Sequence, residues 1–511
     1  MEAESKLLQA ALKAGLEKKD AKATIKSGLI SGIKKTKQQP QINPMDAIAS
    51  DFIECFHDYS GAPLVSINTP EGKRTLEVGS DYCEAWLRKK LKSILGKAPI
   101  QRKVDEMMSQ IRAECMYGNK KDVFRRFGHN SAMLGFDLTD DKNQCVLIYN
   151  GDWNIVNNSP IEFVASTAME SAPVPNKVTD TMAALNKLRK VINLPTEEQF
   201  ILFIGFLIQC FQKRGPYFHL AITGINGSCK TFVQKVIRIL LDPRTDKSIS
   251  MPRSEEGIAL AAYSRGIVTI DNISKLSIDQ SDWLCRLSTG GGFEKRLNFE
   301  NTKTRAFDKP TPAILNGIQQ YIKRQDLLER CILLELERIP ESERKPETEL
   351  LETLYNDLPD ILGGLLNAVA IAHRDVDKVK LAKYPRMADA TKWITAAEPE
   401  LGWKPGTFQN AYKQNLALKA DNQIKSDRVA TLLLDYCEAQ GKTGEIFANS
   451  ISHLLKCLNS FSPAFAEKKV MANKLSTYVT TAAPMLEAYG ISIHQTGSGG
   501  GNLSHIVITM D

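Results

Sequence analysis

The sequence contains no C-x-x-C pair, no long apolar run and little net charge beyond its N-terminal segment. Its ten cysteines are scattered, which argues against zinc ribbons and disulfide frameworks and indicates a reducing compartment. The most apolar stretch, residues 200–211, has 12 residues, whereas a membrane-spanning helix needs roughly 20. The first residues lack the pattern of a secretory signal. We therefore expect a soluble cytoplasmic protein with no membrane partner, in which residues 200–211 form a buried helix.

Positive charge is concentrated at the start of the chain. Residues 1–41 hold nine lysines against four acidic residues, which is five of the net seven positive charges. The rest is close to neutral, so any contact with nucleic acid must be local. The apolar residues of the head have helical spacing. The head is either a small helical piece with solvated lysines or an arm that binds nucleic acid.

The pattern divides the chain into four parts. Residues 1–45 are a basic helical head or linker, and residues 46–175 form an N-terminal α+β domain. In that domain we expect one helix over residues 80–95 and a strand-turn-strand meander over residues 131–164. Residues 190–408 are expected to form an α/β core with a helical lid, and residues 409–511 a C-terminal domain.

The α/β core is predicted from four short apolar runs that alternate with helical segments, which is typical of a parallel sheet. These runs are FHLAIT, GIVTIDN, TPAILNG and CILLEL. In the C-terminal part we expect helices around residues 426–440 and 445–459 and a third from residue 466. Two strands around a Gly-rich tip follow, so this part has a winged-helix pattern. There are no internal repeats.

Residues 220–240 carry the chemistry most directly. An apolar strand leads into a Gly-rich turn, Lys-Thr and an amphipathic helix, the layout of a P-loop whose backbone N–H groups cradle phosphate. Lys230 would neutralise the β- and γ-phosphates of ATP, and the Thr231 hydroxyl would bind Mg²⁺. Cys229 occupies the last glycine position of the pattern, where a small side chain is the next best choice. The predicted nucleotide-binding residues are Gly224, Ile225, Asn226, Gly227, Ser228, Cys229, Lys230 and Thr231.

Asp271 ends the second apolar run, 41 residues after Lys230. This is the Walker B pattern, in which a buried strand presents a carboxylate to Mg²⁺; the alternative is a plain core strand that ends at a helix cap. Asn272 replaces the usual second acid, and an amide can orient water but cannot take its proton. Another acid then substitutes, or hydrolysis is slow, or the site only binds. The acids available are Glu255, Glu256, Asp279 and Asp282.

Three polar residues further along match these two motifs in order and spacing. Asn316 ends the third apolar run, Arg330 follows 14 residues later, and Arg386 opens a helix of the predicted lid. AAA+ ATPases place sensor 1, the arginine finger and sensor 2 in this order. The finger reaches the nucleotide of the neighbouring subunit and stabilises transition-state charge. We therefore expect Lys230, Asp271, Asn272, Asn316, Arg330 and Arg386 to act in catalysis.

Two basic regions are candidate DNA contacts. Lys303 and Arg305 lie at the polar tip of a predicted hairpin between the second and third apolar runs. In ring helicases such a hairpin projects into the channel and grips single-stranded DNA; the alternative is an exposed hairpin with solvated charges. The second set lies in the winged-helix pattern, which serves protein contacts as well as DNA. It comprises Lys468, Lys469, Asn473, Lys474 and Tyr478.

These motifs resemble the primase-helicase-type AAA+ proteins of bacterial phages and integrative mobile elements, near the superfamily 3 and minichromosome-maintenance-like helicases. The matching stretches include GINGSCKT, IDNISKLSIDQSDWLCRLSTGGGFEKR, PAILNGI, DLLERCILLEL and RMADATKWITAAEPELGW. The resemblance is strong over residues 195–410 and weaker on either side. It implies a P-loop AAA+ core with ATP and Mg²⁺ as cofactors, in a homo-hexamer in the bacterial cytoplasm. It also implies that Asn272 is a family trait, whereas Cys229 departs from the usual glycine.

Three hypotheses follow for the function. The first is a ring-forming DNA helicase that replicates a mobile element or phage and draws single-stranded DNA through its pore. The second is an ATP-switched replication initiator or loader that binds DNA without unwinding it. The third is an AAA+ signalling or defence ATPase. A small-molecule kinase has no use for the sensor and finger residues. No primase motif is visible, so any priming would come from a separate protein.

Overall fold

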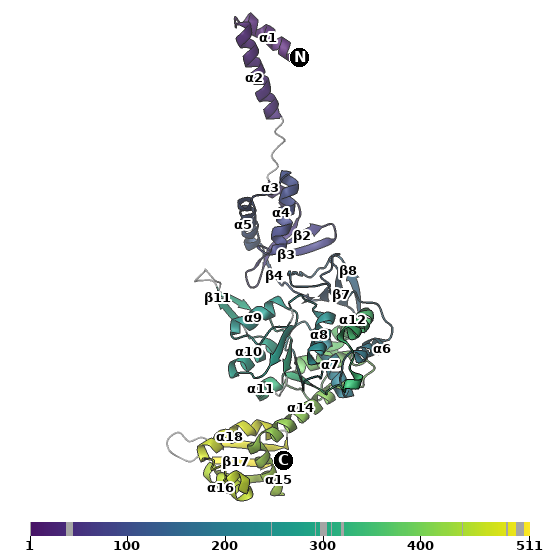
Figure 1. Cartoon of the computed structure of the whole chain (residues 1–511), viewed down its shortest axis with the longest axis vertical. Coiled ribbons are helices and arrows are strands. Elements are labelled where there is room, and N and C mark those ends of the chain that lie inside the picture. Colours follow the sequence, from purple (N-terminus) through teal and green to yellow (C-terminus); the bar gives the residue numbers. More distant parts are fainter. Residues whose placement is uncertain are drawn as a thin grey trace.

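The computed structural model describes the 511-residue chain except residues 1, 37–43, 247, 292, 297–303, 308, 318–320, 442, 487–488, 497–504 and 511. Figure 1 shows a large central α/β unit with a smaller α/β unit at one end and a C-terminal unit at the other. The head consists of α1 (Glu2–Lys13) and α2 (Lys18–Thr36), which pack against each other. The helical prediction for the head is therefore confirmed.

The first sheet of the N-terminal unit has the order β3-β2-β1-β4, with β1, β2 and β3 antiparallel and β4 parallel to β1. Helix α4 matches the predicted segment because Ser80 caps its first turn and Cys83, Leu87 and Leu91 form one buried face. Helix α5 was not predicted. The elements are α3 (Pro44–Ala49), β1 (Phe52–Asp58), β2 (Pro63–Thr69), β3 (Gly72–Glu77), α4 (Asp81–Leu95), α5 (Gln101–Tyr117) and β4 (Asn119–Lys121).

The predicted meander is an antiparallel sheet of the order β5-β6-β7-β8. Its strands are β5 (Phe127–His129), β6 (Leu134–Asp137), β7 (Cys145–Tyr149) and β8 (Asp152–Val156). The fully buried Arg126 joins it to the central unit, because its guanidinium contacts the Asp242 carboxylate at 3.3 Å and donates to the carbonyl of Glu170 at 2.7 Å. Leu134 and Phe136 of β6 and Val146 and Ile148 of β7 belong to the same hydrophobic core as α7 and α12.

The central sheet has four parallel strands in the order β10-β13-β9-β14, and each comes from one of the four predicted apolar runs. All four strands therefore end at one edge, where ligands bind in open α/β sheets. The strands are β9 (His219–Gly224), β10 (Val268–Ile273), β13 (Ala313–Gly317) and β14 (Cys331–Leu336). Between β10 and β13 the chain forms α10 (Ile278–Thr289) and the paired strands β11 (Phe293–Arg296) and β12 (Thr304–Phe307).

Helices cover this sheet on both faces (Figure 1). Helix α7 is buried around its whole circumference, as predicted from its apolar run. Among the described residues, no helix combines the length and the apolar composition that spanning a bilayer requires. The remaining elements are α6 (Thr181–Asn186), η1 (Lys187–Lys190), α7 (Glu197–Gln209), α8 (Lys230–Leu241), α9 (Glu255–Ser264), α11 (Gln325–Leu328), η2 (Glu341–Glu343), α12 (Glu347–Asp375), η3 (Val376–Lys378) and α13 (Ala388–Ala397).

The C-terminal unit begins with a single helix, α14 (Thr407–Ser426), so the expected boundary after residue 408 falls inside a helix. Its three-stranded sheet has the order β15-β17-β16. Residues 444–450 form a strand, where the sequence pattern had suggested the start of a helix. The elements are α15 (Arg428–Ala439), β15 (Gly444–Ser450), α16 (Ile451–Phe461), α17 (Pro463–Ala466), α18 (Ala472–Leu486), β16 (Ile491–Thr496) and β17 (His505–Met510).

Candidate nucleotide-binding site

The Gly-rich loop leaves β9 at the edge where the parallel strands end and enters α8 at Lys230. Gly224 has φ +150°, and a Cβ there would lie 2.5 Å from the carbonyl oxygen of Leu336. Gly227 has φ +84°. Both positions therefore require glycine. The turn leads directly into the N-terminus of α8, and backbone N–H groups at a helix N-terminus bind anions.

Cys229 is the residue immediately before α8, with φ 61° and ψ 28°. This is the left-handed region, which costs an ordinary L-residue roughly 1–2 kcal/mol and costs glycine nothing. One reason for the usual glycine here is that a larger side chain would crowd a nucleotide bound by the loop. The backbone conformation is a second and independent reason, and the half-buried thiol is the exception that it tolerates.

The Lys230 ammonium turns back onto its own loop. It donates hydrogen bonds to the carbonyl oxygens of Gly224 at 2.7 Å and Ile225 at 3.0 Å. Partial burial lowers the pKa of Lys230, and the Asp271 carboxylate opposes that shift. The Ser228 hydroxyl also donates to the Ile225 carbonyl, at 2.9 Å. A phosphate bound by this loop would have to replace the two bonds of the ammonium.

Asn316 is the centre of the site, because its side-chain amide reaches both predicted motifs. The amide nitrogen donates to Asp271 Oδ1 at 2.8 Å and approaches Thr231 Oγ1 at 3.4 Å. It also donates to Gln234 Oε1 at 3.1 Å. Asn316 is 2% exposed, so these contacts are shielded from bulk water. Residues that lie 85 positions apart in the chain are thus brought into one hydrogen-bonded group.

Gln234 was missed by the sequence reasoning. It lies on the first turns of α8, four residues after Lys230, and is 2% exposed. Its Nε2 atom is buried and has no hydrogen-bond partner among the described residues, a costly state for a buried amide. The available signal was an amide on the otherwise apolar face of an amphipathic helix.

Asn272 departs from regular strand geometry. Its φ is 58°, and the pairing of β10 with β13 shifts register between Ile270 and Ile273. This β-bulge re-aims the Asp271 side chain, and the Asn272 backbone N–H donates to Asp271 Oδ1 at 2.8 Å. Asparagine enters the left-handed region more readily than glutamate, so the residue type agrees with the backbone as well as with the chemistry.

Two acids considered as a replacement base are engaged elsewhere. Glu255 accepts from Arg286 at 2.6 Å, and Asp282 accepts from Arg324 at 2.6 Å. Sequence spacing alone could not have shown either ion pair. Both carboxylates are held by an arginine, which leaves them poorly suited to act as a base at Asp271.

Arg330 and Arg386 are brought together by the short helix α11. Arg330 Nη1 donates to Asp326 Oδ1 at 2.7 Å, and its side chain is 12% exposed. Arg386 forms ion pairs with the same Asp326 carboxylate and with Glu329, the latter at 3.0 Å. Arg330 Nε is buried without a partner among the described residues. The predicted sensor 2 residue therefore contacts the segment of the predicted finger.

Two other arginines lie beside the P-loop and were not singled out from sequence. A Cβ at Gly227 would lie 3.3 Å from Arg344 Nη2 and 4.0 Å from Arg338 Cγ. The chain is held there by a hydrogen bond from the Ile339 N–H to the Gly227 carbonyl at 3.4 Å. Residues 337–345, which directly follow β14, hold Arg338, Arg344 and Lys345 together with three glutamates. Both arginines approach Glu341, at 3.8 and 3.7 Å, so the positive charge that they place beside the candidate phosphate site is partly balanced.

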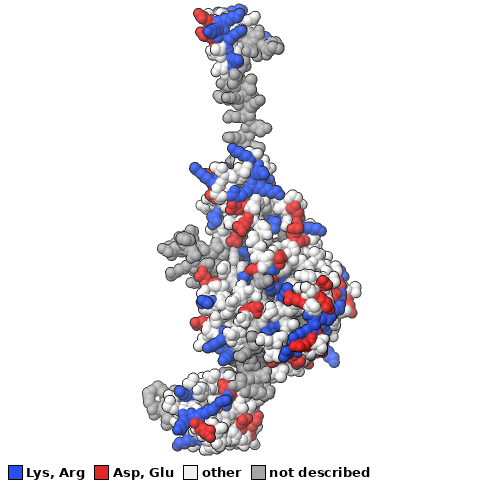
Figure 2. Space-filling model, in the orientation of Figure 1, with Lys and Arg blue, Asp and Glu red and all other residues white. Residues whose placement is uncertain are grey.

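The candidate DNA-binding residues are described only in part. Lys303 lies outside the described residues. Arg305 lies on strand β12 opposite Lys295, not at the tip of the hairpin as expected, and its side chain is outside the described set. Lys468, Lys469 and Lys474 are exposed at or before the start of α18. Figure 2 shows both basic and acidic residues on the visible face of the C-terminal unit.

One protein family and several solved structures are similar to this chain. Residues 185–409 match a family described as actinomycete integrative conjugative element replication proteins. An apo structure of the NrS-1 C-terminal region is 12% identical with a TM-score of 0.42, covering 93% of this chain and 100% of that chain. A JCV helicase structure is 18% identical with a TM-score of 0.23, covering 47% and 64%. Curated proteins give no match. Over residues 185–409, this chain is thus similar to replication proteins of integrative conjugative elements. This range includes Lys230, Asp271, Asn316, Arg330 and Arg386.

Proposed function

We propose that the protein is an ATP-dependent, ring-forming DNA helicase that serves replication of a mobile genetic element. The observation that carries the proposal is the hydrogen-bonded group of Asn316, Asp271 and Thr231 beside a Gly-rich loop at the carboxyl edge of a parallel sheet. The family match over the same residues supports the biological setting.

The residues present fit ATP and Mg²⁺. The Thr231 hydroxyl and the Asp271 carboxylate are oxygen ligands of the kind that Mg²⁺ prefers, and the loop has no Cβ atom at Gly224 and Gly227, where its backbone has positive φ. Bound Mg²⁺ would neutralise phosphate charge. Lys230 would hold the phosphates, Asn316 would orient the Asp271 carboxylate, and the buried Gln234 amide supplies a spare donor.

Arg330 is proposed to act on the nucleotide of the next subunit, in a homo-hexamer. Its support is a largely buried guanidinium that Asp326 holds in place while Nε stays unpaired among the described residues. Arg386, which shares Asp326, would fix the position of that finger. Lys303, Arg305 and the rest of the β11–β12 hairpin would contact single-stranded DNA in the channel.

The C-terminal unit is proposed to be a winged helix that binds DNA. Its element order from α15 to β17 is helix, strand, helices, strand, strand, and β17 lies in the middle of the sheet. Lys468, Lys469 and Lys474 would contact phosphates next to α18. Replacing all three with Gln should weaken duplex binding and flatten its salt dependence. Unchanged binding at low salt would contradict this role.

Forked-DNA unwinding tests the main proposal. Lys230→Ala should abolish ATP binding and unwinding together. Arg330→Ala should retain ATP binding and lose at least about 100-fold in ATPase rate, since a finger acts on the transition state. Arg102→Ala is the control, because that side chain is 86% exposed on α5. An Arg330→Ala protein that unwinds at the parental rate would overturn the assignment.

A second candidate is an ATP-switched initiator that binds DNA without unwinding. It is favoured by Asn272, whose amide cannot accept a proton, and by the ion pairs that hold Glu255 and Asp282. ATP-dependent DNA binding without strand separation would select it over the helicase. Negative-stain images with ATP and DNA would show whether a ring forms.

A further inference from the structure

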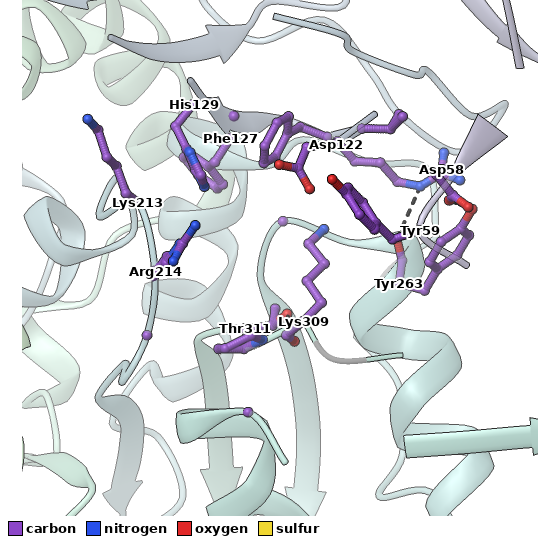
Figure 3. A pocket seen from close by; sticks show the side chains of 18 of the residues that line it. Asp58, Tyr59, Asp122, Phe127, His129, Lys213, Arg214, Tyr263, Lys309 and Thr311 are labelled. Carbon is purple, nitrogen blue, oxygen red and sulfur yellow. Dashed lines mark hydrogen bonds between the residues drawn. The ribbon is translucent and has the colours of Figure 1, made fainter. Parts of the chain in front are cut away.

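A cavity of about 590 Å³ lies between the N-terminal unit and the central sheet, and it contains no residue of the P-loop. Its walls come from the end of β1, from residues 121–129 and 210–217, from α9, and from residues 289–290 and 309–312. The last two segments are the two ends of the insertion that carries the β11–β12 hairpin. The cavity is thus formed by both units and by the base of the hairpin (Figure 3).

Positive charge in this cavity is not neutralised by its own walls. The Lys309 ammonium and the Arg214 guanidinium have no ion-pair or hydrogen-bond partner in the part of the chain that the structure describes. Figure 3 shows the Lys309 side chain rising from the floor toward Asp122 and Tyr263, with Lys213 and Arg214 on a neighbouring segment. The Lys213 ammonium donates to the Ser131 carbonyl at 3.0 Å.

The acidic residues of the cavity are mostly engaged. Glu77 pairs with Arg125 at 3.2 Å. Asp58 is 9% exposed and accepts from Ser60 at 2.7 Å and from the Ala62 N–H at 2.8 Å. Asp122 remains as an acceptor that faces the space. Among the described residues, the walls therefore present two cations, Lys309 and Arg214, and one carboxylate, Asp122, without an ion-pair partner. This polar pattern suits a ligand with both a phosphate and hydrogen-bond donors.

The lowered pKa values of two amines that line the cavity agree with an anionic ligand. Burial lowers the pKa of Lys309 to about 8, and the nearby positive charge of Arg125 adds to the effect. Burial also lowers the pKa of Lys213. An anion placed next to these amines would favour their charged forms and recover the free energy that burial costs.

Aromatic rings complete the lining. Tyr59 is 70% exposed at the edge of the cavity. Tyr263 lies beneath the Arg125 guanidinium at 4.9 Å, and Phe124 packs against His129 at 4.9 Å. Of these rings, Tyr59 has the most open face, and an open aromatic face beside cations is the usual platform for a nucleobase.

We propose that this cavity binds one phosphorylated nucleoside, with Lys309 and Arg214 on the phosphate, Tyr59 against the base and Asp122 on a base or sugar donor. The ligand is either a free nucleotide or one residue of a single DNA strand. Lys309 lies seven residues before Asn316 on the segment that enters β13, and the Thr311 N–H bonds the Leu287 carbonyl of α10 at 2.8 Å. A ligand bound in this cavity would therefore affect the position of the hairpin base and of Asn316 in the candidate nucleotide site.

The test uses the full chain carrying Lys230→Ala without Mg²⁺, so that neither P-loop binding nor ATP hydrolysis contributes. One arm measures dAMP by titration calorimetry, and the other measures a fluorescein-labelled 12-nucleotide thymidine strand by anisotropy. Lys309→Gln and Arg214→Gln should each weaken binding about tenfold or more, the usual loss of one charge-assisted contact. Lys309→Arg should retain most of the affinity, and Tyr59→Ala should also weaken binding.

Lys97→Gln is the matched control, because it removes an exposed lysine that does not line the cavity. Losses in the dAMP arm identify a free nucleotide as a ligand, and losses in the strand arm alone identify a strand residue. If Lys309→Gln and Arg214→Gln bind both probes like Lys97→Gln, the proposal is wrong. Because the P-loop is disabled throughout, that outcome would leave the helicase proposal standing.

Discussion

At the scale of single residues, Cys229 has a backbone conformation that its residue type adopts only at a cost in free energy. Its left-handed conformation is suited to glycine, yet the chain carries a thiol there. Asn272 has a similar backbone but a residue type that adopts it more easily. The backbone strain is therefore larger at Cys229 in the P-loop than at Asn272 in the bulge.

Relieving that strain should stabilise the protein. Cys229→Gly is expected to raise the free energy of unfolding by about 1 kcal/mol, because glycine has no Cβ penalty in this region. Denaturant unfolding measures the change. Cys229→Ser is the control, since it keeps the Cβ and should show no gain. Equal stability of the Gly and Ser variants would contradict the strain.

Thiol chemistry should report on the same position. Alkylation is expected to block ATP binding, bound nucleotide should protect, and Cys229→Gly should bind ATP and resist alkylation. Cys55 and Cys457 are the other half-buried cysteines, so a Cys55→Ser/Cys457→Ser protein should stay sensitive. Fluorescent-nucleotide binding before and after iodoacetamide gives the result. If Cys229→Gly is inhibited as strongly as the parent, another thiol is responsible.

At the scale of elements, His219 joins three parts of the central sheet. Its Nε2 donates to the Leu284 carbonyl of α10 at 2.8 Å, and its Nδ1 accepts from the Ala313 N–H of β13 at 3.1 Å. The ring is fully buried. Both bonds are satisfied by one neutral tautomer, so the strand, its neighbour and the helix are held in register by an uncharged side chain.

This predicts a pH-dependent stability. Burial lowers the pKa of His219 to about 4, whereas in the unfolded chain it is about 6.5. The unfolded chain therefore takes up a proton that the folded chain does not, and stability falls as pH drops from about 6.5 to about 4. The loss should approach about 3 kcal/mol.

The comparison is between two variants measured across that range. His219→Gln should unfold with a flatter pH profile than the parent, because the titrating ring is gone. His453→Gln, which replaces an exposed histidine, should keep the parental slope. Parallel profiles for the parent and His219→Gln would contradict the assignment.

The elements also show what a sequence can predict. The four core strands were predictable because buried parallel strands are continuous apolar runs. Helix α4 had a clear helical period, and α7 was predicted from its 12-residue apolar run. Strand β15 was not, because it pairs with β17 about 60 residues later, and non-local pairing leaves little local signal. Helix α5 carries the buried positions Val104, Met107, Ile111 and Cys115, so its pattern was present and was overlooked.

The candidate site divides in the same way. The grouping of Thr231, Asp271 and Asn316 was predictable because each lies at or just after an apolar run that predicts a strand, and parallel strands end at one edge of the sheet. Gln234 and Arg344 were not, since their contacts depend on helix phase and on how the chain returns past the P-loop after β14. The cavity between the two units could not have been foreseen, because at least six separate segments of the chain build it.

At the scale of the whole molecule, two kinds of arginine would serve each nucleotide. Arg344 lies beside the P-loop of its own chain, while Arg330 is proposed to serve the neighbour. In a ring, the two roles have different consequences when subunits are mixed. A mixing experiment therefore separates them without any structural measurement.

Mixtures of inactive subunits provide the test. Lys230→Ala with Arg330→Ala should regain ATPase activity, because some interfaces join an intact P-loop to an intact finger. Lys230→Ala with Arg344→Ala should remain inactive, because each P-loop then lacks either its own lysine or its own arginine. Each variant alone is the control. Absence of recovery in the first mixture would contradict action between subunits.

Helix α14 has a consequence of its own, since Phe408 is buried in the central core and Ile424 in the C-terminal core. Its 20 residues span about 30 Å, and each residue turns the chain by about 100°. The number of residues between the two cores therefore sets the rotation of the C-terminal unit about the axis of α14. Inserting two residues into α14 should rotate the C-terminal unit by roughly 200° and uncouple duplex binding from unwinding. Inserting seven residues, which is close to two full turns, should nearly restore its orientation. If the two-residue and seven-residue insertion variants unwind DNA equally well, the orientation of the C-terminal unit does not matter and α14 acts only as a linker.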